Sequence, residues 1–515
     1  MDPTRASGVL LHVTSLPSPG GCGDLGREAY DFVGGLARAG QGVWQVLPLG
    51  PTGYGDSPYQ CFSAFAGNPL LVDLRDLAAR GWLTADELAE APRFPEAAVD
   101  FERVKPWRIG LLRRAFERFG LSAEPEPRND WDKFCIENEW WLSDFALYMA
   151  IKREQGEVEW TRWPAELAAR QPEAIAQARQ RLRDEIDFQT FVQWQFFQQW
   201  QALKAHANAA GVRIVGDVPI FVAHDSTDVW ASRELFKLDE RGLPAVVAGV
   251  PPDYFSSTGQ HWGNPIYDWD RQAVRGYDWW VRRLRQAMTM FDLVRLDHFR
   301  GFVAHWEIPA DAPTAASGRW MTGPGAALFA AATSQLGPLP LIAEDLGVIT
   351  PAVVSLREEF GYPGMRILQF AFGDDPEAPN YLPHHYVPDC VVYTGTHDND
   401  TAVGWFHSRA GEGTTRSAEQ IARERDYALA YVNTDGREIH WDLIRLALAS
   451  VARLAVFPLQ DVLGLGTEAR MNLPSTTSGN WRWRLAPGQF TAEHEQRLRK
   501  LAETYDRGMF ATGGS

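Results

Sequence analysis

The sequence is poor in cysteine and has no long apolar run. Its 515 residues include only Cys22, Cys61, Cys135 and Cys390, and no two of them have the spacing of a zinc ligand pair or a redox disulfide. No stretch approaches the length of a membrane span, and the apolar run at 8–11 is too short for a signal peptide. We therefore expect a cytoplasmic protein with no membrane partner.

Basic residues are also in deficit. The 50 lysines and arginines are outnumbered by 66 acidic residues, which gives a formal net charge of -16. Such a charge repels phosphate backbones, so no nucleic-acid partner is expected. No Gly-rich loop that could cradle a phosphate group is visible, and we expect no cofactor. A neutral substrate fits this balance, although an acidic surface also serves simply to keep a protein in solution.

The sequence does contain eight short, nearly continuous apolar runs. This pattern is typical of strands buried on both faces of a parallel sheet, and amphipathic stretches such as 27–39 and 277–291 lie between most of them. Eight strand-helix units predict an α/β fold, a (β/α)8 TIM barrel. An open doubly wound sheet is less favoured, because no Gly-x-Gly-x-x-Gly turn follows the first run. The runs are 9–12, 43–49, 212–218, 293–297, 339–344, 365–370, 390–394 and 454–459.

Three long segments interrupt the strand pattern. We expect one catalytic barrel over 1–515 that carries a helical subdomain at about 70–210, an insertion rich in Pro, Gly and aromatic residues at about 219–270, and a mixed insertion at about 404–451. After the eighth run only a loop and one terminal helix, 491–507, are expected. No C-terminal β-sandwich is predicted.

Three carboxylates, Asp297, Glu344 and Asp398, stand at or just beyond the ends of the fourth, fifth and seventh runs. The active groups of barrel enzymes project from these strand ends. Retaining glycoside cleavage needs one carboxylate as nucleophile and one carboxylic acid about 5 to 5.5 Å away. A third can oppose the positive charge on the sugar. Arg295 lies two residues before Asp297 and can keep that carboxyl ionised with a low pKa, while the charge of Asp297 can keep Glu344 protonated.

Ordinary structural or metal-binding roles are alternatives to each of these catalytic assignments. A single Asp at a strand end is more often a helix cap or an ion-pair partner. His298 and His397 adjoin the proposed catalytic residues, which favours hydroxyl binding over a core role. A metal site is disfavoured, because no His-x-His pair ends the first run and Arg295 would oppose a cation. Most of the 21 tryptophans belong in cores, but Trp262 lies in a Gly- and Pro-rich loop and is a candidate for stacking on sugar.

Five motifs surround these residues. They are GYGDSPY at 53–59, GDVP at 216–219, VRLDHFRG at 294–301, AEDLG at 343–347 and THDNDT at 396–401. In this order they resemble the amylomaltases and plant disproportionating enzymes, a branch of the alpha-amylase clan, and the resemblance covers nearly the whole chain. It implies a 4-alpha-glucanotransferase of starch or glycogen metabolism that moves alpha-1,4-glucan segments from a donor to glucose or another glucan through a covalent glycosyl-enzyme. Large cyclic glucans are a further expected product.

The resemblance also implies roles for individual residues. Asp297 is the nucleophile, Glu344 the general acid/base and Asp398 the stabiliser of the transition state. Tyr59 is expected to stack on the sugar at the cleavage subsite. The residues that the resemblance implies contact hydroxyl groups or the nucleophile are Ser57, Asp217, Arg295 and His397.

Residues farther from the carboxylates are also implicated by the resemblance. The segment 251–265 is similar to a mobile loop over the acceptor subsites, which could exclude water from the glycosyl ester. Tyr54 is expected either to bind glucan at a second groove or to pack as an ordinary loop aromatic. Two residues depart from the family pattern, Val13 in place of Pro and Ser475 in place of Gly. The remaining expected substrate contacts are Tyr254, Phe255, Gln260, Trp262 and Asn472.

Two other functions compete with glucan transfer. A hydrolase of the same clan would form the same covalent intermediate and pass it to water. A glucan-binding protein without activity would be expected to lack one of the three carboxylates, and all three are present. The expected partners are an alpha-1,4-glucan donor and a sugar acceptor. The pattern favours no particular oligomeric state.

Overall fold

The centre of the molecule is a closed barrel of eight parallel strands, as the sequence predicts. The computed structural model describes residues 5–121, 125–252, 258–411, 416–476 and 478–510. Around the barrel the strands follow the order β1, β2, β3, β6, β9, β10, β11 and β12, and β12 pairs with β1. Their bounds are β1 (Ala6–Leu10), β2 (Val43–Gln45), β3 (Arg213–Val218), β6 (Leu293–Leu296), β9 (Leu341–Ala343), β10 (Gly364–Ile367), β11 (Cys390–Tyr393) and β12 (Leu454–Pro458).

The first strand begins three residues earlier than its apolar run. Ala6 pairs with Leu454 of β12, so the ladder starts before the run at 9–12. The residues that end this run continue instead into a short 3-10 helix, η1 (Val13–Ser15). Hydrophobicity reports burial, and here burial extends beyond the hydrogen-bonded ladder.

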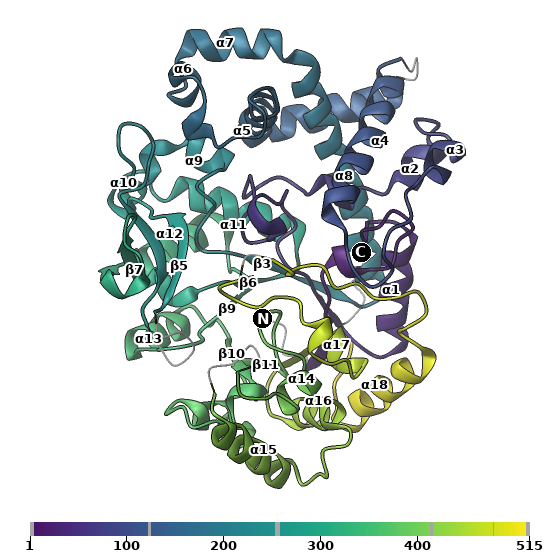
Figure 1. Cartoon of the computed structure of the whole chain (residues 1–515), viewed down its shortest axis with the longest axis vertical. Coiled ribbons are helices and arrows are strands. Elements are labelled where there is room, and N and C mark those ends of the chain that lie inside the picture. Colours follow the sequence, from purple (N-terminus) through teal and green to yellow (C-terminus); the bar gives the residue numbers. More distant parts are fainter. Residues whose placement is uncertain (1–4, 122–124, 253–257, 412–415, 477, 511–515) are drawn as a thin grey trace.

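Helices surround the barrel and form two larger groups on opposite sides of it. Helix α1 shows why they form, since Ala29, Phe32, Val33 and Leu36 make one buried stripe at helical spacing. In Figure 1 helices α4 to α8 gather on one side of the barrel and α14 to α18 on the opposite side. The helices are α1 (Arg27–Arg38), α2 (Leu74–Ala79), α3 (Ala85–Ala89), α4 (Phe101–Leu121), α5 (Pro125–Glu154), α6 (Ala165–Ala168), α7 (Pro172–Arg181), α8 (Arg183–Ala209), α9 (Thr227–Ala231), α10 (Trp269–Val274), α11 (Asp278–Met290), α12 (Ala326–Leu336), α13 (Pro351–Glu359), α14 (Ala402–Phe406), α15 (Ala418–Val432), α16 (Ile439–Ala449), α17 (Leu459–Val462) and α18 (Ala492–Thr504).

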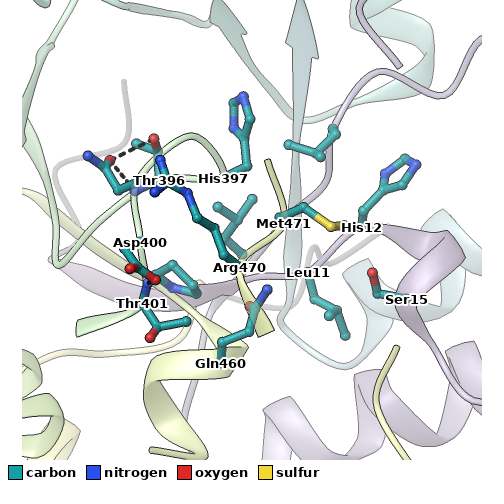
Figure 2. A pocket seen from close by; sticks show the side chains of 14 residues that line it. Leu11, His12, Ser15, Thr396, His397, Asp400, Thr401, Gln460, Arg470 and Met471 are labelled. Carbon is teal, nitrogen blue, oxygen red and sulfur yellow. Dashed lines mark hydrogen bonds between the residues drawn. The ribbon is translucent and has the colours of Figure 1, made fainter. Parts of the chain in front are cut away.

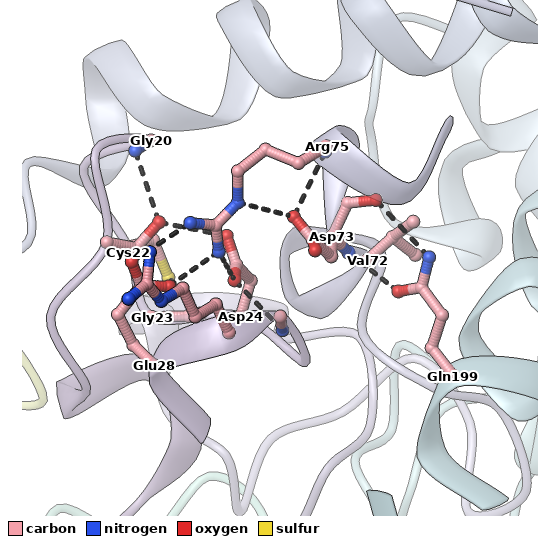
Figure 3. A network of polar contacts seen from close by, with 12 residues as sticks. Gly20, Cys22, Gly23, Asp24, Glu28, Val72, Asp73, Arg75 and Gln199 are labelled. Carbon is pink, nitrogen blue, oxygen red and sulfur yellow. Dashed lines mark hydrogen bonds and ion pairs between the residues drawn. The ribbon is translucent and has the colours of Figure 1, made fainter. Parts of the chain in front are cut away.

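A buried polar network ties the helices between β2 and β3 to the loop after β1. Arg108 of α4 is 1% exposed; it contacts a carboxylate oxygen of Asp24 at 3.4 Å and donates to the carbonyl oxygen of Val72 at 2.6 Å. Arg75 of α2 binds Asp73 and Glu28 (Figure 3). The hydrophobic core is also continuous from the barrel into these helices. This part of the chain is therefore fastened to the barrel by both apolar and polar contacts.

A second, antiparallel sheet lies beside the barrel and was not predicted. Its order is β5, β4, β7, β8. Gln260 and Trp262, expected on a loop, lie on the edge strand β5. Their strand contains Gly and Pro and does not alternate, so its sequence is not typical of a strand. The strands are β4 (Val246–Val250), β5 (Gln260–Pro265), β7 (Ala304–Pro309) and β8 (Arg319–Thr322).

Helices α5 and α8 are the longest, with 30 and 27 residues. That length would suffice to span a bilayer. Across the described ranges, however, no helix combines such length with enough apolar character to cross a membrane.

Candidate active site

Two neighbouring strands place Asp297 and Glu344 side by side. Leu296 of β6 pairs with Ala343 of β9, and each of the two acidic residues directly follows one member of that pair. The backbone N–H of Glu344 donates to the carbonyl oxygen of Leu296 at 3.1 Å. Because paired strands lie about 4.8 Å apart, both side chains start from adjacent points on the C-terminal rim of the barrel.

Asp297 is held by one arginine. Arg295 Nη2 lies 2.8 Å from Asp297 Oδ1, and its Nη1 donates to both carboxylate oxygens of Asp217, at 2.9 and 2.7 Å. The register of β3 against β6 sets this arrangement, since Asp217 pairs with Arg295. Burial raises the pKa of Asp297 to about 6 against the lowering effect of Arg295, and the nearby charge of Asp217 adds to the rise. The expected low pKa is thus wrong in direction, although Asp297 is still mostly ionised at neutral pH.

Glu344 is buried and receives two backbone hydrogen bonds. His298 N donates to Oε2 at 2.6 Å, and Leu346 N donates to Oε1 at 2.9 Å. Burial raises the pKa of Glu344 to about 8, and the charge of Asp297 contributes to the rise. The two carboxyls therefore differ in protonation at neutral pH, one ionised and the other protonated.

Asp398 follows β11 and opens to solvent, with 47% of its side chain exposed. Asn472 Nδ2 donates to Oδ1 at 2.6 Å, and His397 Nε2 lies 3.4 Å from Oδ2. Arg470 donates to the Asp398 carbonyl oxygen at 2.6 Å. The negative charge of Asp398 contributes to the raised pKa of Asp297, so the three predicted carboxylates lie close enough to interact electrostatically. Arg470 was not among the predicted site residues, although it stands two residues before Asn472.

An aromatic cluster lines the same region. The rings of Tyr59 and His397 stack at 5.0 Å, and the Tyr59 hydroxyl donates to Asp217 at 2.8 Å. Trp481 tilts against both rings, at 5.8 and 5.9 Å. The sequence offers no signal for Trp481, which is one of 21 tryptophans and reaches the site only through the fold.

Figure 2 shows side chains that line a small cavity, which is bordered by the end of β1 and by the segments that carry Thr396, His397 and Arg470. Its volume of about 20 Å³ leaves room for roughly one water molecule. His12 lines it, and burial lowers the pKa of this histidine to about 3. His12 ends the first apolar run, so the strand-end rule could have identified it. The cavity shares His397 with the aromatic cluster, so it adjoins the proposed site.

The second sheet brings Trp262 to the catalytic rim. The ring of Trp262 meets that of His298 edge-on at 4.9 Å, and its Nε1 donates to Gln260 at 3.0 Å. His298 has a left-handed backbone with φ of 49°. Burial lowers its pKa to about 3, and the nearby charge of Arg300 adds to the effect, so the imidazole is neutral. A neutral imidazole can bind hydroxyl groups as donor or acceptor.

The other predicted contacts have different surroundings. Ser57 Oγ accepts from Tyr59 N at 3.2 Å, which makes it part of a local turn. Tyr54 is 75% exposed on the short 3-10 helix η2 (Tyr54–Asp56). Tyr254 and Phe255 lie outside the described residues.

Comparison with known proteins gives one consistent result. Residues 11–490 match the family model described as 4-alpha-glucanotransferase. The 4-alpha-glucanotransferase of Thermus thermophilus is 53% identical over 509 residues, which cover 98% of this chain and 100% of the relative. That of Synechocystis is 48% identical over 511 residues, 99% of each chain. Among solved structures, the amylomaltase from Streptococcus agalactiae in complex with acarbose has a TM-score of 0.93 and 39% identity, and the match covers 98% of this chain and 100% of that one.

Proposed function

Because the chain belongs to the family of 4-alpha-glucanotransferases, we propose that Asp297, Glu344 and Asp398 carry out the family's transfer of an alpha-1,4-glucan segment to a sugar acceptor. One observation supports these roles above all others. Asp297 and Glu344 follow paired residues of adjacent strands, and their surroundings leave one carboxyl ionised and the other protonated. Two carboxyls with divided protonation are what retaining glycosyl transfer requires.

In the first step a carboxylate oxygen of Asp297 attacks the anomeric carbon of the donor. The bond from this carbon to the glycosidic oxygen breaks, and that oxygen takes the proton of Glu344 as the leaving glucan departs. Arg295 orients the nucleophile, since it is itself fixed by Asp217. Asp398, held by Asn472, opposes the positive charge that develops on the sugar ring.

In the second step an acceptor hydroxyl gives its proton to Glu344, and its oxygen attacks the anomeric carbon. The ester bond to Asp297 breaks, and the configuration of the donor is retained. Esterification has by then removed the charge of Asp297, which is one cause of the raised pKa of Glu344. The carboxylate of Glu344 is therefore a suitable base at this stage.

The surrounding side chains supply the binding surface. Tyr59, with His397 stacked behind it, offers a ring to the sugar at the cleavage point. His298, Gln260 and Trp262 lie together beside Glu344 and suit the acceptor. The exposed ring of Tyr54 suits a second glucan contact.

The donor is proposed to be an alpha-1,4-linked oligosaccharide or glucan, and the acceptor glucose or another glucan. A solved relative, the Streptococcus agalactiae amylomaltase, holds acarbose, which supports binding of sugar chains by this fold. Large cyclic products would follow when the acceptor hydroxyl belongs to the donor itself. We place the reaction in the cytoplasm, because all four cysteines are free thiols.

Incubation with maltotriose alone tests the reaction class. Glucose together with a ladder of longer maltooligosaccharides is the expected result, whereas a hydrolase would release only shorter sugars. Treatment with a 5-fluoro glycosyl fluoride tests the nucleophile, because this donor forms the ester quickly and releases it slowly. Mass spectrometry is expected to find the sugar on the peptide that contains Asp297. A label on another carboxylate would contradict the assignment.

Replacement of Trp262 tests whether the second sheet protects the ester from water. In Trp262→Ala we expect the ratio of hydrolysis to transfer to rise several-fold, on the order of the effect of one lost positioning contact. The ratio is measured as glucose released relative to longer products from maltotriose. The exposed Trp140 of α5 offers a matched control, Trp140→Ala. An unchanged ratio in Trp262→Ala would contradict this role.

A further inference from the structure

Arg300 belongs to the motif at 294–301 but has no part in the mechanism above. It lies on the 3-10 helix η6 (Phe299–Phe302), directly after the catalytic end of β6, and is 8% exposed. Its Nη1 donates to the carbonyl oxygen of Val348 at 2.7 Å. Its guanidinium lies over the ring of Trp320 at 3.9 Å. A buried arginine with two such contacts is held in one position.

The two segments that Arg300 joins are the two that hold Glu344. His298, two residues before Arg300, donates its N–H to Oε2 of Glu344. Leu346, two residues before Val348, donates its N–H to Oε1. Gly347 turns the chain between Leu346 and Val348 with φ of 84°. The hydrogen bond from Arg300 to Val348 therefore closes a ring around the Glu344 carboxyl.

We propose that Arg300 is a positioning residue for Glu344, and that it sets the direction from which this carboxyl gives its proton to the leaving oxygen. The inference rests on the proposed role of Glu344 as acid/base. Without the bond to Val348, the segment that carries Leu346 is free to shift, and one of the two N–H donors moves away from the carboxyl. A displacement of about 1 Å in a catalytic group can cost about 100-fold in rate.

Through Trp320, the second sheet also helps to hold Arg300 in place. It lies on β8, is 40% exposed, and packs edge-on against Trp306 of β7 at 5.1 Å. Stacking fixes the plane of the guanidinium, which leaves one N–H aimed at Val348. Lysine has one charged point and no plane, so it cannot reproduce both contacts.

The test compares two donors that differ in their need for a proton. Maltotriose has a leaving oxygen that must be protonated, whereas the fluoride of alpha-maltosyl fluoride departs as an anion when Asp297 attacks. For either donor kcat/KM reports the steps up to formation of the glycosyl-enzyme. In Arg300→Met we expect kcat/KM to fall roughly 10- to 100-fold with maltotriose and less than about 3-fold with the fluoride. Arg300→Lys should show the same selective loss to a smaller extent.

Controls separate this inference from the assignment of Glu344. Glu344→Gln must itself lose far more activity with maltotriose than with the fluoride; if it does not, the acid/base role fails. If Glu344→Gln shows the selective loss and Arg300→Met loses activity equally with both donors, or with neither, the positioning role is overturned. Arg497 also stacks on a tryptophan, Trp441, at 4.3 Å, and Arg497→Met is the matched control. Should Arg300→Met not fold, Trp320→Phe is expected to give the same selective loss, and equal rates with both donors would overturn the proposal.

Discussion

The molecule buries two clusters in which arginines meet carboxylates, and the clusters differ in how fully those carboxylates are used. In the network of Figure 3, both oxygens of Asp24 are engaged, by Ser18, Gly26 and two arginines. In the cluster of proposed catalytic residues, Asp297 forms one ion pair within the described part of the chain, with Arg295, and its side chain is 26% exposed. A saturated carboxylate holds a fold together. A carboxylate with a free lone pair at the barrel mouth is available to react.

The two clusters also differ in backbone conformation. Residues in and around the catalytic cluster adopt left-handed φ angles, 49° at His298, 66° at Ser475 and 65° at Trp481. Asp24 and Arg108 of the network do not. Strain of this kind collects where side chains must be aimed rather than merely packed.

The largest expected effect separates activity from stability. Asp297→Asn should lower the transfer rate by about 10⁴-fold or more, because the amide cannot form the ester. Its melting temperature should stay close to that of the wild type, since Arg295 keeps Asp217 as a partner. Rates with maltotriose and thermal unfolding are the two measurements. Asp24→Asn is the control, with lower stability and unchanged activity per folded molecule. Substantial activity in Asp297→Asn would erase the distinction between the clusters.

Arg108→Met should lower stability and leave activity unchanged, the reverse of Asp297→Asn. It removes a buried cation from Asp24 and Val72, and breaking such a pair costs about 3 to 5 kcal/mol of unfolding free energy. Denaturant unfolding measures the loss, and transfer activity per folded molecule should be unchanged. If the free energy of unfolding is unchanged, the network does not stabilise the fold.

The pH dependence of activity tests the protonation states proposed for Asp297 and Glu344. In the proposed mechanism Asp297 must be ionised, so activity should fall as pH drops below about 6. Glu344 must be protonated for the first step, so activity should also fall as pH rises above about 8. A profile of kcat/KM for maltotriose should show both limbs. Asp217→Asn removes a charge that raises the pKa of Asp297 and should move the acid limb to lower pH. An acid limb that stays in place would contradict this coupling.

The smallest expected effect concerns strain beside the catalytic cluster. Ser475 is exposed and has φ of 66°, a region that glycine adopts without a steric cost. Ser475→Gly should raise the unfolding free energy by roughly 0.5 kcal/mol, the net of relieved strain and the greater entropy of glycine in the unfolded chain. A small rise in melting temperature checks this, with Ser475→Ala as the control that should bring none. A fall in Ser475→Gly would mean that the side chain supports the loop.

Sequence patterns predicted the barrel because its strands are buried on both faces and end in polar residues. Leu293 to Asp297 illustrates this, since burial and the C-terminal rim are both visible in five residues. The strands of the second sheet show no comparable pattern of a buried apolar run that ends in a polar residue. Val247 pairs with Ile308, far along the chain, and the sequence of β5 contains Gly and Pro and does not alternate. Trp481 and the raised pKa of Asp297 depend on which side chains the fold brings together, so they required the structure.

The pairing of β6 with β9 also has a consequence for biogenesis. Asp297 and Glu344 belong to strands that are neighbours in space and are separated in the chain by a second-sheet excursion and a helix. Parallel pairing at that separation must wait for a loop to close, whereas helices form locally and early. A nascent chain therefore gains its helices before it possesses an active site. The proposed catalytic residues Asp297, Glu344 and Asp398 follow three different strands of the closed barrel, so they come together only after those strands have paired.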